Sequence, residues 1–110
     1  MTLADVYTAL NGISDITNKV RYRAFPPDQI PNPPYVCYLE TDSANFVADN
    51  KVYNAGDSVD IELYTKLRDF TLEGKIEKAL NDLEVPWTRS SSYMISEEIY
   101  EIIYSITIRR

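Results

Sequence analysis

The residues best suited to chemistry in this chain are carboxylates on a predicted strand. Asp60 and Glu62 stand two positions apart in a segment where apolar and polar residues alternate. Such alternation predicts a half-buried strand, so the two carboxylates share one face. Together with Glu40, from another apolar segment, they would suit a Mg²⁺ site for phosphoryl chemistry. That face is more simply explained as a solvated one, because no motif places a histidine or lysine base beside it.

The groups that common enzymes use as nucleophiles and cofactor ligands are largely absent. The chain has no histidine, which excludes Ser-His-Asp and Cys-His catalysis and the common zinc sites. The one cysteine, Cys37, lies in an apolar segment, where a buried core thiol is expected rather than a nucleophile. The three glycines form no phosphate-binding loop. We therefore expect no catalytic residues, no bound metal and no cofactor.

Length and composition predict one globular domain over residues 1–110. The apolar share is 45% and the charged share 25%, which are ordinary values for a folded domain. Seventeen acidic residues against eleven basic ones give a formal charge of −6. A protein that grips nucleic-acid phosphates would have the opposite balance. The start of the chain does not resemble a signal peptide, and no apolar run has membrane-spanning length.

The segment from Ser58 to Leu83 organises the predicted fold. Its first part alternates as a strand, and its second part places apolar residues at helical spacing. Asp69 and Thr71 are both candidates for the N-cap of this helix. Gly74 in the helix interior costs about 1 kcal/mol relative to alanine and is expected to let a neighbouring backbone approach closely. The apolar stripe of the helix must pack on the strands that flank it.

The other segments complete an α+β fold, a mostly antiparallel sheet with two helices packed on one face, plus a short hairpin. Thr2 and Asp5 are spaced as a capping box for the first helix. In the last strand, Tyr100 and every second residue after it as far as Ile108 are expected to face the core. In chain order we expect a helix over 2–11, a strand over 19–25, a proline-rich loop over 25–34, a strand over 35–41, a hairpin over 43–54 with strands near 46–47 and 51–53, a turn over 54–57, an edge strand over 87–89, a turn or loop over 90–92 and strands over 93–108.

Five segments in this order carry a resemblance that covers nearly the whole chain. They are MTLADVYTALNGI, PNPPYVCYLE, NFVADNKVYNAGDSVDIELYTK, LEGKIEKALNDLEVPW and EEIYEIIYSITI. The arrangement resembles small proteins at the head–tail junction of long-tailed bacteriophages, the tail terminator, tail completion and tail-to-head joining group. The similarity is one of pattern and order, and the run from Asp49 to Thr65 is its most specific part.

This resemblance implies a helix-on-sheet fold that assembles into a ring, often a hexamer, without catalytic residues or cofactor. Its partners would be further copies of the chain, the tail tube protein and the head–tail connector proteins. DNA would pass through the ring without being gripped, and no membrane would be involved. The protein would be part of a phage or prophage virion, at the tail or head–tail interface, assembled in the bacterial cytoplasm.

Two regions are hypothetical contact surfaces of such an assembly. One is the predicted hairpin around Phe46, Val47, Asp49 and Asn50, and the other is the stiff proline-rich loop around Pro27 and Ile30. The alternative function is a monomeric adaptor or inhibitor that binds a host or phage protein through an exposed strand edge or hairpin.

Overall fold

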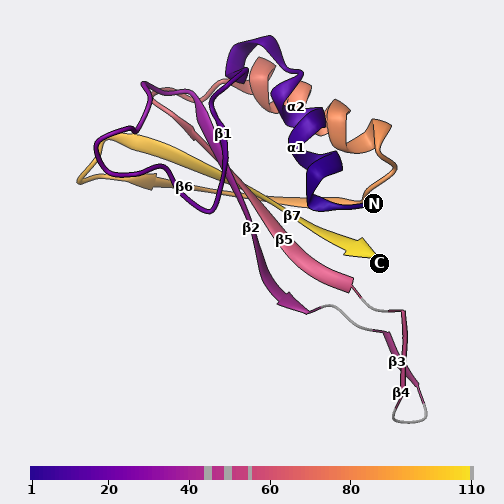
Figure 1. The fold of residues 1–110 in the computed structure, drawn as a ribbon. Coiled ribbons are helices and arrows are strands. Elements are labelled where there is room, and N and C mark those ends of the chain that lie inside the picture. The colour runs from indigo at the N-terminus through magenta and orange to yellow at the C-terminus, as the bar shows by residue number, and fades with distance from the viewer. Residues whose placement is uncertain (44–45, 49–50, 55, 110) are drawn as a thin grey trace.

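The computed structural model describes residues 1–43, 46–48, 51–54 and 56–109, and for 46–48 and 51–54 it describes the backbone only. The helices and strands follow one another along the chain in the order that the sequence predicts (Figure 1). The elements are α1 (Leu3–Asn11), the 3-10 turn η1 (Ser14–Ile16), β1 (Val20–Tyr22), β2 (Tyr35–Ser43), β3 (Phe46–Ala48), β4 (Lys51–Asn54), β5 (Gly56–Thr65), α2 (Phe70–Asp82), β6 (Trp87–Met94) and β7 (Ile99–Arg109).

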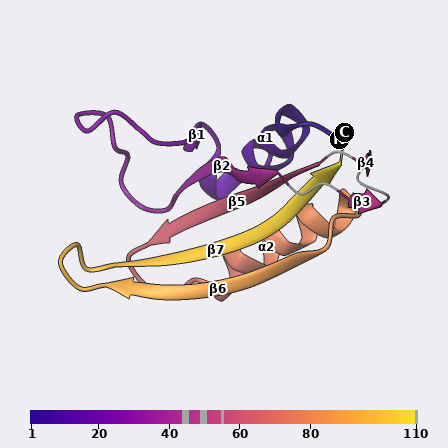
Figure 2. The ribbon, with the colours of Figure 1, turned by 90° about the horizontal axis from the view of Figure 1, so that it is seen from below.

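The main sheet has five strands in the order β1-β2-β5-β7-β6. β1 is parallel to β2, and the other pairings are antiparallel. Both helices cover the same face of this sheet (Figures 1 and 2). The predicted fold class, a mostly antiparallel sheet with two helices on one face and a short hairpin, is confirmed. None of the helices in the described residues is long and apolar enough to cross a membrane.

The core lies between the helices and the sheet, where the predicted apolar positions meet. Every second residue of β5 points toward the helices because strand side chains alternate. Val59, Ile61 and Leu63 are fully buried in this way. The core face predicted for the last strand is confirmed, and α1 and α2 supply the covering side chains. The fully buried helix residues are Val6, Leu10, Leu72, Ile76 and Leu80.

Local signals at the helix ends behave as the sequence predicts. The Thr2 side chain accepts from the Asp5 backbone N–H, and the Asp5 carboxylate accepts from the Thr2 N–H, which completes the capping box. Of the two candidates for the N-cap of α2, Asp69 takes the role, and its carboxylate accepts from the Leu72 N–H at 3.0 Å. The expectation of a close neighbour at Gly74 is wrong, because an added Cβ there would meet open space.

Three strand boundaries differ from the sequence prediction. Residues 90–92 form no turn, because they continue β6 and pair in unbroken register with β7. β5 begins at Gly56, which pairs with Arg109, so the predicted turn does not extend to residue 57. β1 is shorter than predicted, because Arg23 adopts a φ of 66° that takes the backbone out of the strand conformation. Serine-rich and glycine-containing segments resemble loops until a neighbouring strand supplies their backbone partners.

β3 and β4 form a separate two-stranded sheet, here called the arm, which extends from the ends of β2 and β5 (Figure 1). The predicted hairpin is confirmed for these two strands. Asp49 and Asn50, predicted at its tip, lie outside the described residues, as do the side chains of Phe46 and Val47.

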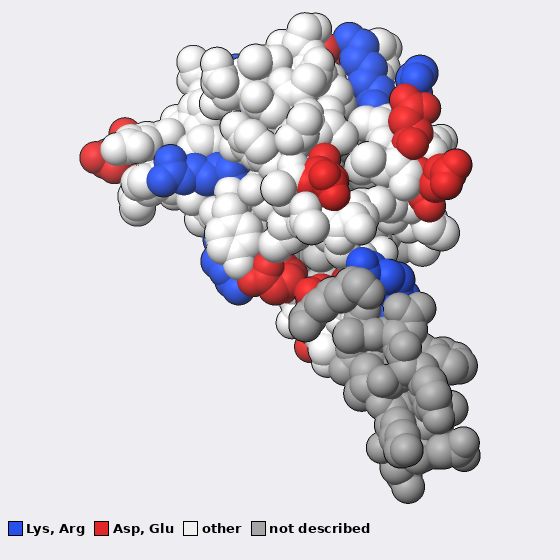
Figure 3. Space-filling model, turned by 45° about the vertical axis from the view of Figure 1, so that its right-hand side comes forward, with Lys and Arg blue, Asp and Glu red and all other residues white. Residues whose placement is uncertain are grey.

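Some charged side chains on the surface are paired with opposite charges. Lys75 of α2 reaches Asp15 of η1 at 2.7 Å, and Lys78 reaches Asp82 within α2 at 2.8 Å. On the face shown in Figure 3, basic side chains lie singly or beside carboxylates and do not form one extended patch. Such exposed pairs contribute little to stability. The face shown in Figure 3 offers no extended basic surface for phosphates.

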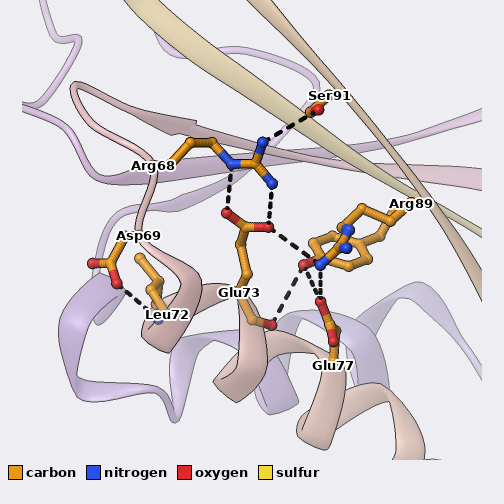
Figure 4. A network of polar contacts seen from close by, with 8 residues as sticks. Arg68, Asp69, Leu72, Glu73, Glu77, Arg89 and Ser91 are labelled. Atoms are coloured by element: carbon orange, nitrogen blue, oxygen red, sulfur yellow. Dashed lines mark hydrogen bonds and ion pairs between the residues drawn. The ribbon is translucent and has the colours of Figure 1, made fainter.

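A buried polar network holds α2 to the sheet (Figure 4). Glu73 is only 1% exposed, and Arg68 donates to both of its carboxylate oxygens at 3.0 and 3.1 Å. Arg89 of β6 lies 3.4 Å from Glu73 and 2.9 Å from Glu77. The Tyr104 hydroxyl of β7 donates to Glu77 at 2.8 Å, and burial raises the pKa of Tyr104, so this hydroxyl keeps its proton. The network joins the loop before α2 to two strands and was not predicted from the sequence.

Replacing Gly74 with alanine is expected to stabilise the protein. The new methyl group meets no neighbour, and alanine loses less backbone entropy in a helix than glycine does. The Gly74→Ala variant should gain about 1 kcal/mol in the free energy of unfolding, measured by urea titration. Gly74→Pro is the control for a helix interior and should lose about 3 kcal/mol. A loss of stability on Gly74→Ala would show that this site is crowded.

Removing Arg68 should destabilise the fold by leaving Glu73 buried with a single, longer ion pair. We expect Arg68→Ala to cost about 2 kcal/mol, a value discounted because Arg68 is itself partly exposed. The double variant Arg68→Ala/Glu73→Gln should recover part of the loss, because no uncompensated charge stays buried. Lys78→Ala, which breaks an exposed pair, should change stability by no more than about 0.5 kcal/mol. Equal effects of Arg68→Ala and Lys78→Ala in urea titration would contradict this role for the network.

Candidate interaction surface

The face of the sheet opposite the helices, here called the open face, carries a second group of polar side chains outside the network. Alternation places Tyr64, Glu62 and Asp60 of β5 on it, with Glu101 of β7 alongside. The pairing of β5 with β7 places Tyr64 directly opposite Glu101 and Asp60 directly opposite Ser105. The Ser105 hydroxyl donates to Asp60 at 2.9 Å. Acidic and hydroxyl groups from two adjacent strands therefore form one continuous surface.

Tyr64 lies between two carboxylates of this surface. Its hydroxyl oxygen is 2.8 Å from Glu101 Oε2 and 3.2 Å from Glu62 Oε1. Partial burial raises the pKa of Tyr64, and the hydrogen bond to Glu101 adds to the effect, so the hydroxyl acts as a donor. Burial also raises the pKa of Glu62, with the charges of Glu101 and Asp60 as further causes. Within the described residues, none of these three carboxylates takes part in an ion pair.

A hollow of about 290 Å³ lies at one end of the open face. Phe25 packs edge-on against Tyr35 with ring centroids 5.6 Å apart, and Tyr35 stacks on Tyr64 at 4.9 Å. Ile30 reaches the same hollow from the proline-rich loop. The lining combines aromatic and aliphatic side chains with a few polar ones, which is the composition of a contact site for an apolar side chain. The lining residues are Arg23, Ala24, Phe25, Ile30, Tyr35, Cys37, Tyr64, Met94 and Glu97.

Cys37 is buried, as predicted, but on the open face rather than in the core beneath the helices. It is 5% exposed, lines the hollow and pairs with Glu62 across the sheet. Burial is the main cause of the raised pKa of its thiol, and the charge of Glu62 adds to it. A thiol with a raised pKa is a poor nucleophile, which agrees with the structural role expected for this residue.

The two predicted contact regions lie far apart. Ile30 is 53% exposed, and Pro27 is exposed in the same loop, which precedes β2. The arm with Phe46 and Val47 follows β2, and Asp49 and Asn50 lie outside the described residues. The nine residues of β2 separate loop and arm, a distance of about 30 Å for an extended strand. The structure therefore gives the chain two separate candidate surfaces instead of one combined site.

The carboxylates considered for a metal site do not meet. Asp60 and Glu62 lie on the open face, whereas Glu40 lies on the helix side, in line with Val36 and Tyr38. There Glu40 accepts from the Tyr22 hydroxyl and pairs with Arg23 at 2.8 Å, which lowers the pKa of Glu40, chiefly through the Tyr22 hydrogen bond. In the part of the chain that the structure describes, no three metal-ligating side chains gather. The alternative that groups these three carboxylates at one metal site is contradicted, because the Glu40 side chain lies on the other face of the sheet from Asp60 and Glu62.

Comparison with known proteins gives a similarity of fold. The structure matches a chain in a solved structure described as "Virion of native gene transfer agent (GTA) particle", with a TM-score of 0.68. The match covers 96% of this chain and 91% of that chain, and the two sequences are 17% identical. No protein-family model matches the chain, and no curated protein sequence does. The two chains thus share an architecture over nearly their full lengths.

The sequence did not reveal the acidic and tyrosine side chains of the open face as a group. Tyr64 and Glu101 are separated by 37 positions, and only the pairing of β5 with β7 brings them together. Two signals were available. Asp60 and Glu62 share one face of their strand, and the residues between the core positions of the last strand are only half polar, which pointed to a surface that the helices do not cover.

Neutralising Glu62 is expected to stabilise the fold at neutral pH. Because the pKa of Glu62 is raised in the folded state, its ionisation costs stability as pH rises through and above the ordinary value of 4.5. Glu62→Gln should therefore be more stable than the parent at pH 7, by less than about 1 kcal/mol after allowing for solvent screening. The advantage should vanish well below pH 4.5, as measured by thermal melts across pH. Glu84→Gln, which removes the same charge from an exposed site, is the control, and an equal gain there would contradict the local origin of the effect.

Proposed function

We propose that this chain is a structural protein of a phage-type particle, located at the tail end or the head–tail junction, where copies assemble into a ring. The similarity of fold to a chain of a gene transfer agent virion, with a TM-score of 0.68 over 96% of this chain, carries the proposal. The resemblance in segment order to tail terminator and head–tail joining proteins supports the finer assignment. In this role the protein turns over no substrate.

The separation of the two candidate surfaces suits a ring. In a ring each subunit presents one surface to the copy on one side and a different surface to the copy on the other. The proline-rich loop with Ile30 lies before β2, and the arm lies after it, so the two regions can contact different partners. Those partners would be further copies of the chain, the tail tube protein and the head–tail connector proteins.

The charge of the chain suits a channel through which DNA passes. Binding to phosphates gains free energy from counterion release when cations cluster on a surface. Here the formal charge is −6, and the carboxylates of the open face are not neutralised by ion pairs within the described residues. In a phage or prophage particle such a ring would let DNA slide past without holding it.

A monomeric adaptor or inhibitor is the second candidate. Within the described residues no strand pairs with the outer edge of β6, which favours this candidate because such an edge can accept a strand from a host or phage protein. The two candidates differ in self-association, since a ring protein binds its own copies and an adaptor binds one partner in a one-to-one complex.

The solution mass distinguishes the two candidates. We expect light scattering behind a sizing column to give a closed oligomer near six chains, with a mass that stays constant once the ring has formed. A strict monomer up to millimolar concentration that forms a one-to-one complex with a single partner would favour the adaptor and contradict the ring.

A charge placed on the arm should weaken assembly and leave the fold intact. In the part of the chain that the structure describes, the strand of Phe46 pairs with β4 alone, outside the main sheet, so Phe46→Asp should lower the oligomer fraction without lowering the melting temperature. Ala4→Asp adds the same charge on an exposed position of α1 and should leave assembly unchanged. Unaltered assembly of Phe46→Asp, or a large drop in its melting temperature, would count against a role of the arm in contacts.

A further inference from the structure

The two edges of the main sheet differ in their capacity to accept another strand. β1 has three residues and is followed by Arg23 at a positive φ and by Pro26 and Pro27, which cannot donate to a strand. β6 has eight residues, and all of them pair with β7 on its inner side without a register shift. Its outer backbone groups have no strand beside them in the described residues. The sheet thus has one edge, at β1, that is poorly suited to accept another strand, and one open edge, at β6.

The open edge lacks the features by which proteins usually protect a strand edge. Such features are lysines, prolines, bulges and covering elements. The residues of β6 include no proline and no lysine, and the pairing shows no bulge. Its one charged side chain, Arg89, turns toward α2 and binds Glu77 and Glu73. Ser90, Ser91 and Ser92 are exposed and too small to obstruct an incoming backbone.

Charge and apolar surface indicate which strand this edge would accept. Arg68 and Arg89 balance Glu73 and Glu77 beside the middle of β6, and Glu97 and Glu98 follow its end, in a chain whose formal charge is −6. Exposed apolar side chains flank its end. Tyr93 is 45% exposed and packs on Tyr100, and Phe70 is 66% exposed beneath the Arg68 guanidinium. A neutral strand with apolar side chains meets no charge repulsion here.

The arm has these properties and lacks support of its own. Within the described residues, β3 and β4 pair only with each other. A lone two-stranded hairpin is at best marginally stable in water, so it gains from a further strand. The segment 46–54, FVADNKVYN, holds one acidic and one basic residue and four large apolar ones, so it has no net charge and suits an edge with exposed apolar side chains at its end. The chain therefore contains both a strand donor and a strand acceptor.

We propose that the arm of one copy adds as a strand to the outer edge of β6 in the next copy. The proposal deepens the ring assembly proposed above and rests on it. Main-chain hydrogen bonds supply the affinity, and the apolar side chains at the end of β6 supply the specificity. Because donor and acceptor lie on different parts of the chain, the contact is head-to-tail, which generates a ring when the rotation closes.

Disulfide trapping between chains that each carry one added cysteine tests this contact. One chain carries Ala48→Cys or Lys51→Cys on the arm, and a second chain, distinguished by a mass tag, carries Ser90→Cys or Ser92→Cys on β6. We expect mild oxidation of the mixture to link arm to edge in at least one of the four combinations, with no linked product from either chain alone. The unmutated chain is the control and should not link, because Cys37 is buried.

Each outcome has a definite reading when the mass in solution is measured alongside. Mixed links support the strand addition, whether the oligomer is a closed ring or an open chain. Edge-to-edge links between two Ser90→Cys chains would overturn it in favour of symmetric pairing of β6. A closed oligomer without mixed links would overturn the strand addition and leave the ring standing. A strict monomer without links would overturn both.

A charged edge provides an independent test on the protein without added cysteines. Ser90→Lys/Ser92→Lys places two lysines on β6, as natural edge strands do, and should reduce the oligomer fraction at least tenfold. Ala4→Lys/Thr8→Lys adds the same charges to exposed positions of α1 and should leave the oligomer unchanged. Full assembly of the Ser90→Lys/Ser92→Lys variant with an unchanged melting temperature would overturn the proposal.

Discussion

The burial of Glu73 is the constraint on which the arrangement of this small domain depends. A carboxylate removed from water must be paired, and here two arginines from different elements supply the pairing. Arg68 comes from the loop before α2 and Arg89 from β6, so the loop, the helix and the outermost strand are fixed relative to one another (Figure 4). The apolar stripe of α2 would pack in several registers on a sheet of isoleucines and leucines. The polar network favours one of them, and it also holds β6, a strand in which four of the eight residues are serine or threonine.

The sequence predicted the fold because its core segments follow strict periodicities. Val59, Ile61 and Leu63 alternate as a strand does, and Leu72, Ile76 and Leu80 recur as on one side of a helix. The serines of β6 were mistaken for a turn, because their place in the sheet depends on pairing with Ile102 and Ile103 and not on their own propensity. Of the candidate surface, the shared face of Asp60 and Glu62 and the loop with Pro27 and Ile30 were anticipated among the described side chains. The grouping of Tyr64 with Glu101 depends on strand register, which local sequence does not encode, and Glu40 was grouped with Asp60 although it lies on the other face.

The two faces of the sheet serve different purposes. The helix side gains its stability from apolar burial, whereas the open face holds carboxylates and hydroxyls that stay close to water. Aromatic stacking of Tyr35 on Tyr64 covers Cys37 and forms a small second cluster there, without a helix above it. An uncovered face that is partly packed and partly acidic leaves room for a neighbouring chain at its apolar end and repels polyanions elsewhere. This division suits a protein whose role is proposed to be contact with other proteins around a DNA path.

The serine content of β6 has a consequence for how an assembly would correct its errors. A strand that joins this edge gains backbone hydrogen bonds, each with a net contribution of only about 1 kcal/mol, and buries little apolar surface against the serines. A single contact is therefore weak and reversible, and a wrongly placed copy dissociates again. When the ring closes, every copy makes both of its contacts and no open β6 edge is left, so only the complete ring is long-lived. An edge of leucines or valines would hold each copy more strongly and would trap misassembled ones.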